Sequence, residues 1–227
     1  MTARKRFTIV WDFDGTLLPL APWDSEQELL LARAAGFPRA SWRRLYGRLA
    51  VEADRRGWLL SSFKRRYLAL LRGTPSEFLD QLAARLARRI AAPDREAVRL
   101  LHERGHRQLV ASCGTADMSE RILALGDLRL CFEAVFGNRF VYQQERIAGM
   151  RLEVPSGRAK LEIVKSLGVA PEEAVAVGDG ATDRPLWEWS AVPVVVGRGG
   201  LPAARGLSCR QVASPAGVLE VVRRLGG

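Results

Sequence analysis

Cysteine is scarce in this sequence, and its few copies are widely spaced. The 227 residues contain three, Cys113, Cys131 and Cys209. An odd number of distant cysteines argues against both a disulfide framework and a zinc knuckle. We therefore expect a chain with reduced thiols in the cytoplasm.

Long apolar runs are missing as well. No stretch of about 18 residues is apolar and free of charge throughout, which argues against a membrane-spanning helix. In the opening "MTARKRFTIVW" the apolar part is cut short by Asp12 and Asp14, before it reaches the length of a signal-peptide core. We expect no association with a membrane.

Acidic residues are outnumbered by basic ones, 25 to 35, which gives a formal charge of +10. Such a surplus favours anionic partners, among them phosphorylated metabolites, nucleic acids and lipid head groups. The basic residues are, however, mixed with apolar ones at helical spacing and form only short runs such as "KRR". This pattern is typical of solvated helix faces, so nucleic acid is the less favoured partner.

Histidine occurs twice, as His102 and His106 in "HERGH". The spacing fits the zinc-protease pattern, which requires both histidines on one face of a continuous helix. Gly105 predicts that the helix ends between them, and no third ligand is evident. We interpret the pair as residues that neutralise a helix carboxyl terminus.

The order of predicted elements divides the chain into two units. Residues 7–11, "FTIVW", predict a buried strand, whereas residues 22–93 predict four consecutive helices. From residue 94 onward, strand and helix patterns alternate, as in a parallel sheet with helices on both faces. We predict a Rossmann-like α/β core domain over 1–21 and 94–227, with an inserted α-helical cap domain at 22–93.

Local signals predict how some elements begin and turn. Ser25 and Glu28 have the spacing of a capping box, and so do Thr74 and Glu77. The segment 139–154, "RFVYQQERIAGMRLEV", predicts a hairpin.

Polar clusters follow three of the predicted strands: "DFDGT", "SCGT" and "GDGATD". In a doubly wound parallel sheet these strand ends share one edge, so their carboxylates can converge. The carboxylates are Asp12, Asp14, Asp179 and Asp183. Like charges at one spot need a cation among them, and an all-oxygen ligand set points to a hard ion such as Mg²⁺. "GDGATD" alone predicts a turn, but the constellation favours a metal site.

With these motifs in this order, the sequence resembles the haloacid dehalogenase superfamily of phosphohydrolases. "DFDGT" corresponds to its first motif, Ser112 in "LVASCGT" to the second, Lys160 in "SGRAKLEIV" to the third and "GDGATD" to the fourth. The insertion at 22–93 resembles the helical cap of the phosphoserine-phosphatase-like branch. The resemblance covers essentially the whole predicted core.

The resemblance implies a two-step mechanism. Asp12 would attack phosphorus and form an aspartyl-phosphate, and Asp14 would act as general acid and then general base. Mg²⁺ would be held by Asp12, Asp179 and the backbone carbonyl of Asp14, with support from Asp183.

It also implies a set of residues that bind the phosphoryl group. These are Thr16, Ser112, Cys113, Gly114 and Lys160. Lys160 would stabilise the charge on the transferring group, and we prefer it to Lys165 because it lies at the start of its predicted helix. Cys113 has no nearby histidine in the sequence, so we expect a small buried side chain rather than a nucleophile.

The expected activity is hydrolysis of a small phosphorylated metabolite, since an alkoxide leaving group needs the proton of Asp14 and a halide does not. Two alternatives stay open: a phosphotransferase of the same fold, and a basic nucleic-acid-binding protein with a vestigial site. The sequence selects neither the phosphoester nor the oligomeric state.

Overall fold

The computed structural model describes residues 6–56, 58, 63–197 and 201–226. Within these residues the strands form one sheet in the order β4-β3-β2-β1-β5-β6-β7. All neighbouring strands are parallel except β3 and β4, which form an antiparallel pair at one edge. The strands are β1 (Thr8–Trp11), β2 (Arg107–Thr115), β3 (Ala134–Gln143), β4 (Arg146–Arg151), β5 (Ala174–Gly178), β6 (Val192–Val196) and β7 (Arg210–Val212).

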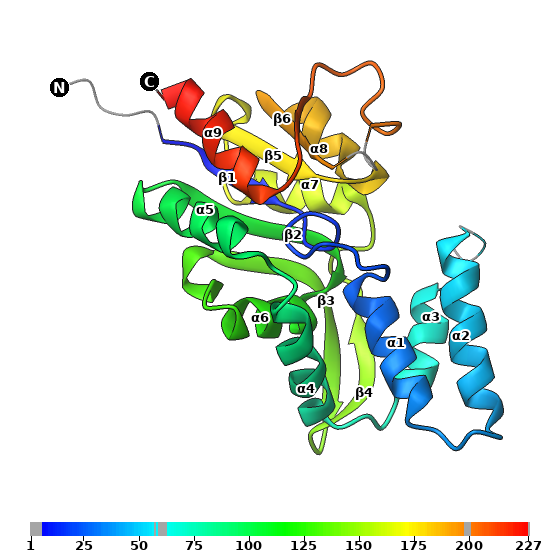
Figure 1. Ribbon diagram of the computed structural model, residues 1–227. Helices are drawn as coiled ribbons and strands as arrows, with labels where there is room; N and C mark the ends of the chain where they lie inside the picture. Colours follow the sequence, from blue (N-terminus) through cyan, green and yellow to red (C-terminus); the bar gives the residue numbers. More distant parts are fainter. Residues whose placement is uncertain (1–5, 57, 59–62, 198–200, 227) are drawn as a thin grey trace.

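Helices cover both faces of the sheet (Figure 1). The side chains of a strand alternate between faces, so Ile9 and Trp11 of β1 pack with α5, α6 and α9, whereas Val10 packs with α7 and α8. These helices are α5 (Ala92–Glu103), α6 (Ala116–Leu125), α7 (Gly157–Ser166), α8 (Arg184–Trp189) and α9 (Pro215–Gly226). The predicted Rossmann-like α/β fold is confirmed.

Among the described residues between β1 and α5, the regular elements are four α-helices. They are α1 (Ser25–Ala35), α2 (Trp42–Arg55), α3 (Phe63–Leu71) and α4 (Ser76–Ala87). Helices α1, α2 and α3 pack against one another beside β4, and α4 packs against α6 and α1 (Figure 1). The insertion thus approaches the core where β2 ends, because α1 also contacts that strand.

The capping predictions for two of these helices are wrong. The N-cap of α1 is Asp24, which accepts the N–H of Gln27 at 2.7 Å, and Gln27 accepts the N–H of Asp24 at 3.4 Å. The box therefore lies one residue before the predicted one, and Ser25 is free for another contact. At α4 the N-cap is Pro75, and the hydroxyl of Thr74 accepts a hydrogen bond from Arg33 Nε at 3.0 Å.

The predicted hairpin forms between β3 and β4. Its turn contains Gln144 and Glu145, both with positive φ. β3 is longer than expected, because the same strand pairs with β2 through its first half.

The two histidines do not share a helix. α5 ends at Glu103, Gly105 adopts φ +77°, and His106 Nδ1 accepts the N–H of Phe7 at 3.2 Å. This geometry supports the interpretation that "HERGH" is not a zinc motif. Among the described residues, each helix is too short or too polar to cross a membrane.

Candidate active site

The carboxyl ends of β1, β2 and β5 are adjacent, because β1 lies between the other two strands. Asp12 follows β1, Ser112 lies near the end of β2, and Asp179 follows β5. Carboxylate oxygens of Asp12, Asp179 and Asp183 lie within 4.8 Å of one another. Three of the four predicted carboxylates thus form one group at this edge of the sheet.

The fourth, Asp14, contacts the helical insertion instead. Its Oδ1 accepts the N–H of Ser25 at 2.7 Å, and its Oδ2 accepts the hydroxyl of Ser25 at 2.8 Å. Burial raises the pKa of Asp14 to about 7, against the opposing effect of these hydrogen bonds. A carboxyl group with such a pKa is available in both forms near neutral pH, as general acid–base chemistry requires.

Lys160 reaches the acidic group from the start of α7. Its ammonium lies 2.9 Å from Asp12 Oδ1 and 2.7 Å from Asp183 Oδ1, and the side chain is fully buried. Burial alone would lower the pKa of Lys160, but the two carboxylates outweigh it and hold the pKa above its usual range, so the ammonium stays charged. Lys165 is 44% exposed and pairs with Glu162, so the structure places Lys160 beside the nucleophile candidate.

One ammonium does not offset three carboxylates. Burial, followed by repulsion from Asp12, raises the pKa of Asp179 to about 7 and that of Asp183 to about 6. Asp183 is held in place because its Oδ2 accepts the N–H groups of Asp179 and Gly180, both at 3.1 Å. A group of convergent carboxylate oxygens with excess negative charge fits a hard divalent cation.

The other four predicted phosphate-binding residues, besides Lys160, fall into two places. Ser112, Cys113 and Gly114 line a cavity with Asp12, and the hydroxyl of Ser112 accepts the N–H of Gly114 at 3.0 Å. Thr16 lies outside that lining and donates to Asp179 Oδ1 at 3.4 Å. Burial raises the pKa of the Cys113 thiol, which keeps it protonated and a weak nucleophile.

Asn138 supports this strand end, although the sequence motifs did not identify it. The side chain is fully buried in β3, donates to the carbonyl of Cys113 at 2.7 Å and accepts the N–H of Val154 at 3.1 Å. It thereby fixes the backbone beside Ser112 to the segment that leads into α7. An asparagine in a strand otherwise rich in apolar residues was the signal available in the sequence.

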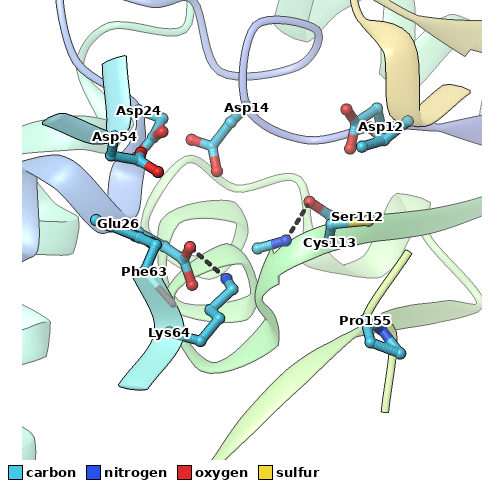
Figure 2. A pocket seen from close by; sticks show the side chains of 12 residues that line it. Asp12, Asp14, Asp24, Glu26, Asp54, Phe63, Lys64, Ser112, Cys113 and Pro155 are labelled. Carbon is cyan, nitrogen blue, oxygen red and sulfur yellow. Dashed lines mark hydrogen bonds and ion pairs between the residues drawn. The ribbon is translucent and has the colours of Figure 1, made fainter. Parts of the chain in front are cut away.

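The cavity has a volume of about 380 Å³ and lies between the sheet edge and the insertion. Figure 2 shows Asp12 and Ser112 on the sheet side, with Asp14, Asp24, Glu26, Asp54 and Lys64 gathered on the other. Its lining consists of Asp12, Asp14, Asp24, Glu26, Asp54, Phe63, Lys64, Ser112, Cys113, Gly114, Pro155 and Thr182.

Comparison with known proteins identifies the family. The family model described as haloacid dehalogenase-like hydrolase matches residues 9–188 of the chain, from β1 to α8. The chain belongs to the haloacid dehalogenase-like hydrolase family. It is therefore an enzyme of that superfamily, as the motifs predicted.

Two curated relatives of this hydrolase are phosphoserine phosphatases. The phosphoserine phosphatase of Archaeoglobus fulgidus is 29% identical over 196 residues, which cover 82% of this chain and 51% of the relative. The chain therefore spans about half the length of that relative. The phosphoserine phosphatase of Wolinella succinogenes is 28% identical over 186 residues, which cover 80% of this chain and 82% of the relative. The solved phospho-aspartyl intermediate analogue of phosphoserine phosphatase has the same fold, with a TM-score of 0.70, 23% identity and coverage of 96% and 99% of the two chains.

Gly15 of this haloacid dehalogenase-like hydrolase must be a glycine for two reasons. Its φ is +80°, and a Cβ would lie 2.0 Å from Asp179 Oδ2. Gly73 has a similar φ, +76°, but a Cβ there would meet nothing within 4 Å. We expect Gly73→Ala to lower the free energy of unfolding by about 1 kcal/mol through backbone strain alone. Gly15→Ala should lower the free energy of unfolding by about 1–3 kcal/mol more than Gly73→Ala does, because the side chain of Asp179 must also move.

Urea unfolding of the two variants measures this difference. Equal losses would show that the approach of Asp179 to the loop does not constrain residue 15.

Proposed function

We propose that the chain is a Mg²⁺-dependent phosphomonoesterase that hydrolyses a small phosphorylated metabolite through an aspartyl-phosphate. The observation that carries this proposal is the position of Asp12. Its carboxylate faces the cavity at the carboxyl end of β1, is paired with the buried Lys160 at 2.9 Å and lies within 4.8 Å of two further carboxylates. The phosphatase relatives support the same chemistry.

In the first step a carboxylate oxygen of Asp12 forms a bond to phosphorus, and the bond from phosphorus to the ester oxygen breaks. The proton of Asp14 passes to that oxygen, so an alcohol leaves. In the second step Asp14 takes a proton from water, whose oxygen attacks phosphorus, and the bond to Asp12 breaks. Inorganic phosphate is released, and both aspartates return to their starting states.

Lys160 and Ser112 complete the proposed machinery from the sheet side. The ammonium of Lys160 balances charge on Asp12 in the resting state and on the phosphoryl oxygens during transfer. Ser112 has a buried hydroxyl within the cavity lining, where it can donate to the same oxygens.

Asp12, Asp179 and the backbone carbonyl of Asp14 would hold the Mg²⁺ ion, with Asp183 supporting the ligands. The raised pKa values of Asp179 and Asp183 fit this assignment, because they reflect burial first and then the negative charge of Asp12, which Lys160 does not fully balance. When bound, the ion supplies positive charge that reduces repulsion between the nucleophile and the phosphate.

Residues 22–93 are proposed to act as a cap that closes over the substrate. In support, five of the cavity-lining side chains come from this segment: Asp24, Glu26, Asp54, Phe63 and Lys64. Closure of such a unit excludes bulk water from the reacting groups.

The direct test is release of inorganic phosphate from a panel of phosphomonoesters, with Mg²⁺ and with EDTA. Metal-dependent release from at least one ester is expected. Transfer to an added alcohol in place of release would instead favour the phosphotransferase reading.

Binding of the ion can be measured without turnover. Saturating Mg²⁺ should raise the Tm by about 5 °C or more, because an ion that binds only the folded state stabilises it. Asp179→Asn should remove most of that shift, yet leave the metal-free Tm unchanged or higher, since it removes one of the mutually repelling charges. Asp117→Asn is the control: Asp117 is also buried but accepts from Phe140 N–H and the Tyr142 hydroxyl, so the Mg²⁺ shift should persist. An unchanged shift in Asp179→Asn would contradict the assigned site.

A further inference from the structure

The wall of the cavity that faces Asp12 is acidic, although the whole chain carries a formal charge of +10. Asp24 is the N-cap of α1, Glu26 lies in its first turn, and Asp54 lies near the end of α2. Among the described lining residues, Lys64 of α3 contributes the one ammonium (Figure 2). Additional carboxylates repel the phosphate of an ester. Their presence in this cavity therefore indicates that they bind another part of the substrate.

The charge of Lys64 is already balanced. Its ammonium pairs with one oxygen of Glu26, and the other oxygen of Glu26 accepts the hydroxyl of Thr115. Glu26 and Lys64 therefore form a neutral, hydrogen-bonded pair, which leaves Asp24 and Asp54 as the uncompensated charges of this wall.

Asp24 and Asp54 are held by neutral donors. Gln27 donates its backbone N–H to Asp24 Oδ1 at 2.7 Å and its side-chain amide to Asp54 Oδ2 at 2.9 Å. Within the described part of the chain, no basic nitrogen lies within ion-pairing distance of either carboxylate. Gln27 thus fixes both carboxylates, and among the residues that the structure describes the second oxygen of each accepts no hydrogen bond, so it is available to another partner.

Burial is the main cause that raises the pKa of both Asp24 and Asp54 above the ordinary value. A cation bound between them would reverse this effect, since an opposite charge stabilises the ionised form.

The same cavity fixes where a substrate must lie. Its phosphorus has to approach Asp12 and Ser112 on the sheet side, so its leaving group extends toward Asp24 and Asp54. Lys64 is the only lysine, and no arginine is present, among the described lining residues, so a carboxylate on the leaving group would meet repulsion and no free cation. The volume of about 380 Å³ suits a small molecule.

We propose that the substrate is the phosphate ester of a small amino alcohol without a carboxylate, whose ammonium group is bound by Asp24 and Asp54. This inference rests on the proposed phosphatase function and specifies its substrate class. Phosphoserine, which the names of the relatives point to, carries a carboxylate and is expected to be the poorer substrate.

The test compares esters that differ in the charge of the leaving group. They are 2-aminoethyl phosphate (cationic), 2-hydroxyethyl phosphate (neutral), 2-phosphoglycolate (anionic) and phosphoserine (cationic and anionic). We expect kcat/KM for 2-aminoethyl phosphate to exceed that of the other three by about tenfold or more, the factor that a charge-assisted hydrogen bond in a partly buried site supplies.

Two substitutions and one control locate the effect. Asp54→Asn and Asp24→Asn should raise KM for 2-aminoethyl phosphate about tenfold and leave the kinetics of 2-hydroxyethyl phosphate unchanged. Asparagine is as good an N-cap as aspartate, so Asp24→Asn keeps the start of α1. Glu52→Gln, on α2 but paired with Arg55 and Arg56, should change neither substrate.

Equal kcat/KM values for the cationic and neutral esters, or a preference for phosphoserine that Asp54→Asn does not alter, would overturn the inference. If no ester is hydrolysed, the proposed function itself fails. In that case the Kd of each ester is measured by calorimetry. Equal affinities for 2-aminoethyl and 2-hydroxyethyl phosphate would then overturn the inference about the ammonium group, independently of the proposed function.

Discussion

Asp12→Asn is expected to lower the rate of phosphate release on the order of 10⁴-fold or more, the range observed when a hydrolase loses its nucleophile. Asparagine has the same shape as aspartate, and its carbonyl oxygen can still accept the N–H of Phe13, which lies 2.8 Å from Asp12 Oδ1, and the ammonium of Lys160. An amide oxygen does not form a stable acyl phosphate, so covalent transfer stops. Phosphate release under saturating Mg²⁺ measures the effect.

The control for Asp12→Asn is another buried aspartate. Asp117→Asn should retain kcat within a few-fold but lose about 1–2 kcal/mol of stability, because it weakens the contacts of a buried carboxylate to Phe140 and Tyr142. Asp12→Asn should show the reverse, with lost turnover and a nearly unchanged urea midpoint. Substantial turnover by Asp12→Asn would exclude the aspartyl-phosphate mechanism.

The convergence of the strand ends could be predicted because it depends on local signals and one rule of topology. Asp12 and Asp179 follow buried strands, and a doubly wound sheet places such ends side by side. The same argument favoured Lys160 over Lys165, since the start of a following helix returns to that edge.

The contacts of Asp14 and Ser25 could not be predicted in the same way. Asp24 and Ser25 are both good N-cap residues, so the sequence alone does not decide which one caps α1. The choice depends on a tertiary contact, because Asp14 accepts two hydrogen bonds from Ser25 and leaves Asp24 to bind Gln27. Thr74 follows the same principle, since its hydroxyl binds Arg33, a residue 41 positions away.

The acidic wall of the cavity opposite Asp12 could not be predicted from the sequence for a related reason. Asp24, Glu26 and Asp54 come from two helices whose faces can be assigned only after they pack. Lys64 and Glu26, which are 38 residues apart, form their ion pair where a third helix, α3, packs against α1. Composition even pointed the other way, because the excess of basic residues predicts an anionic partner.

Lys160→Met is expected to have the second large effect, on stability as well as on turnover. The ammonium is fully buried, at 2.9 Å from Asp12 and 2.7 Å from Asp183, so its loss leaves neighbouring carboxylates without a buried counter-charge. Methionine fills a similar volume, which limits the packing loss. Removal of one partner from a buried ion pair costs about 3–5 kcal/mol, and we expect a loss of that order in metal-free buffer. Lys165→Met, on the exposed side of the same helix, should change stability by about 0.5 kcal/mol or less.

A double-mutant cycle with Asp183→Asn separates lost charge balance from lost packing. If uncompensated charge causes the loss, removal of Asp183 should relieve part of it, and Lys160→Met/Asp183→Asn should be more stable than the sum of the two single losses predicts. If methionine merely packs poorly, the two losses should add, because the cavity would be the same with either residue at 183. Turnover provides the second criterion: the double variant should stay inactive even where its stability recovers, since Asp12 and the phosphoryl group still lack the ammonium.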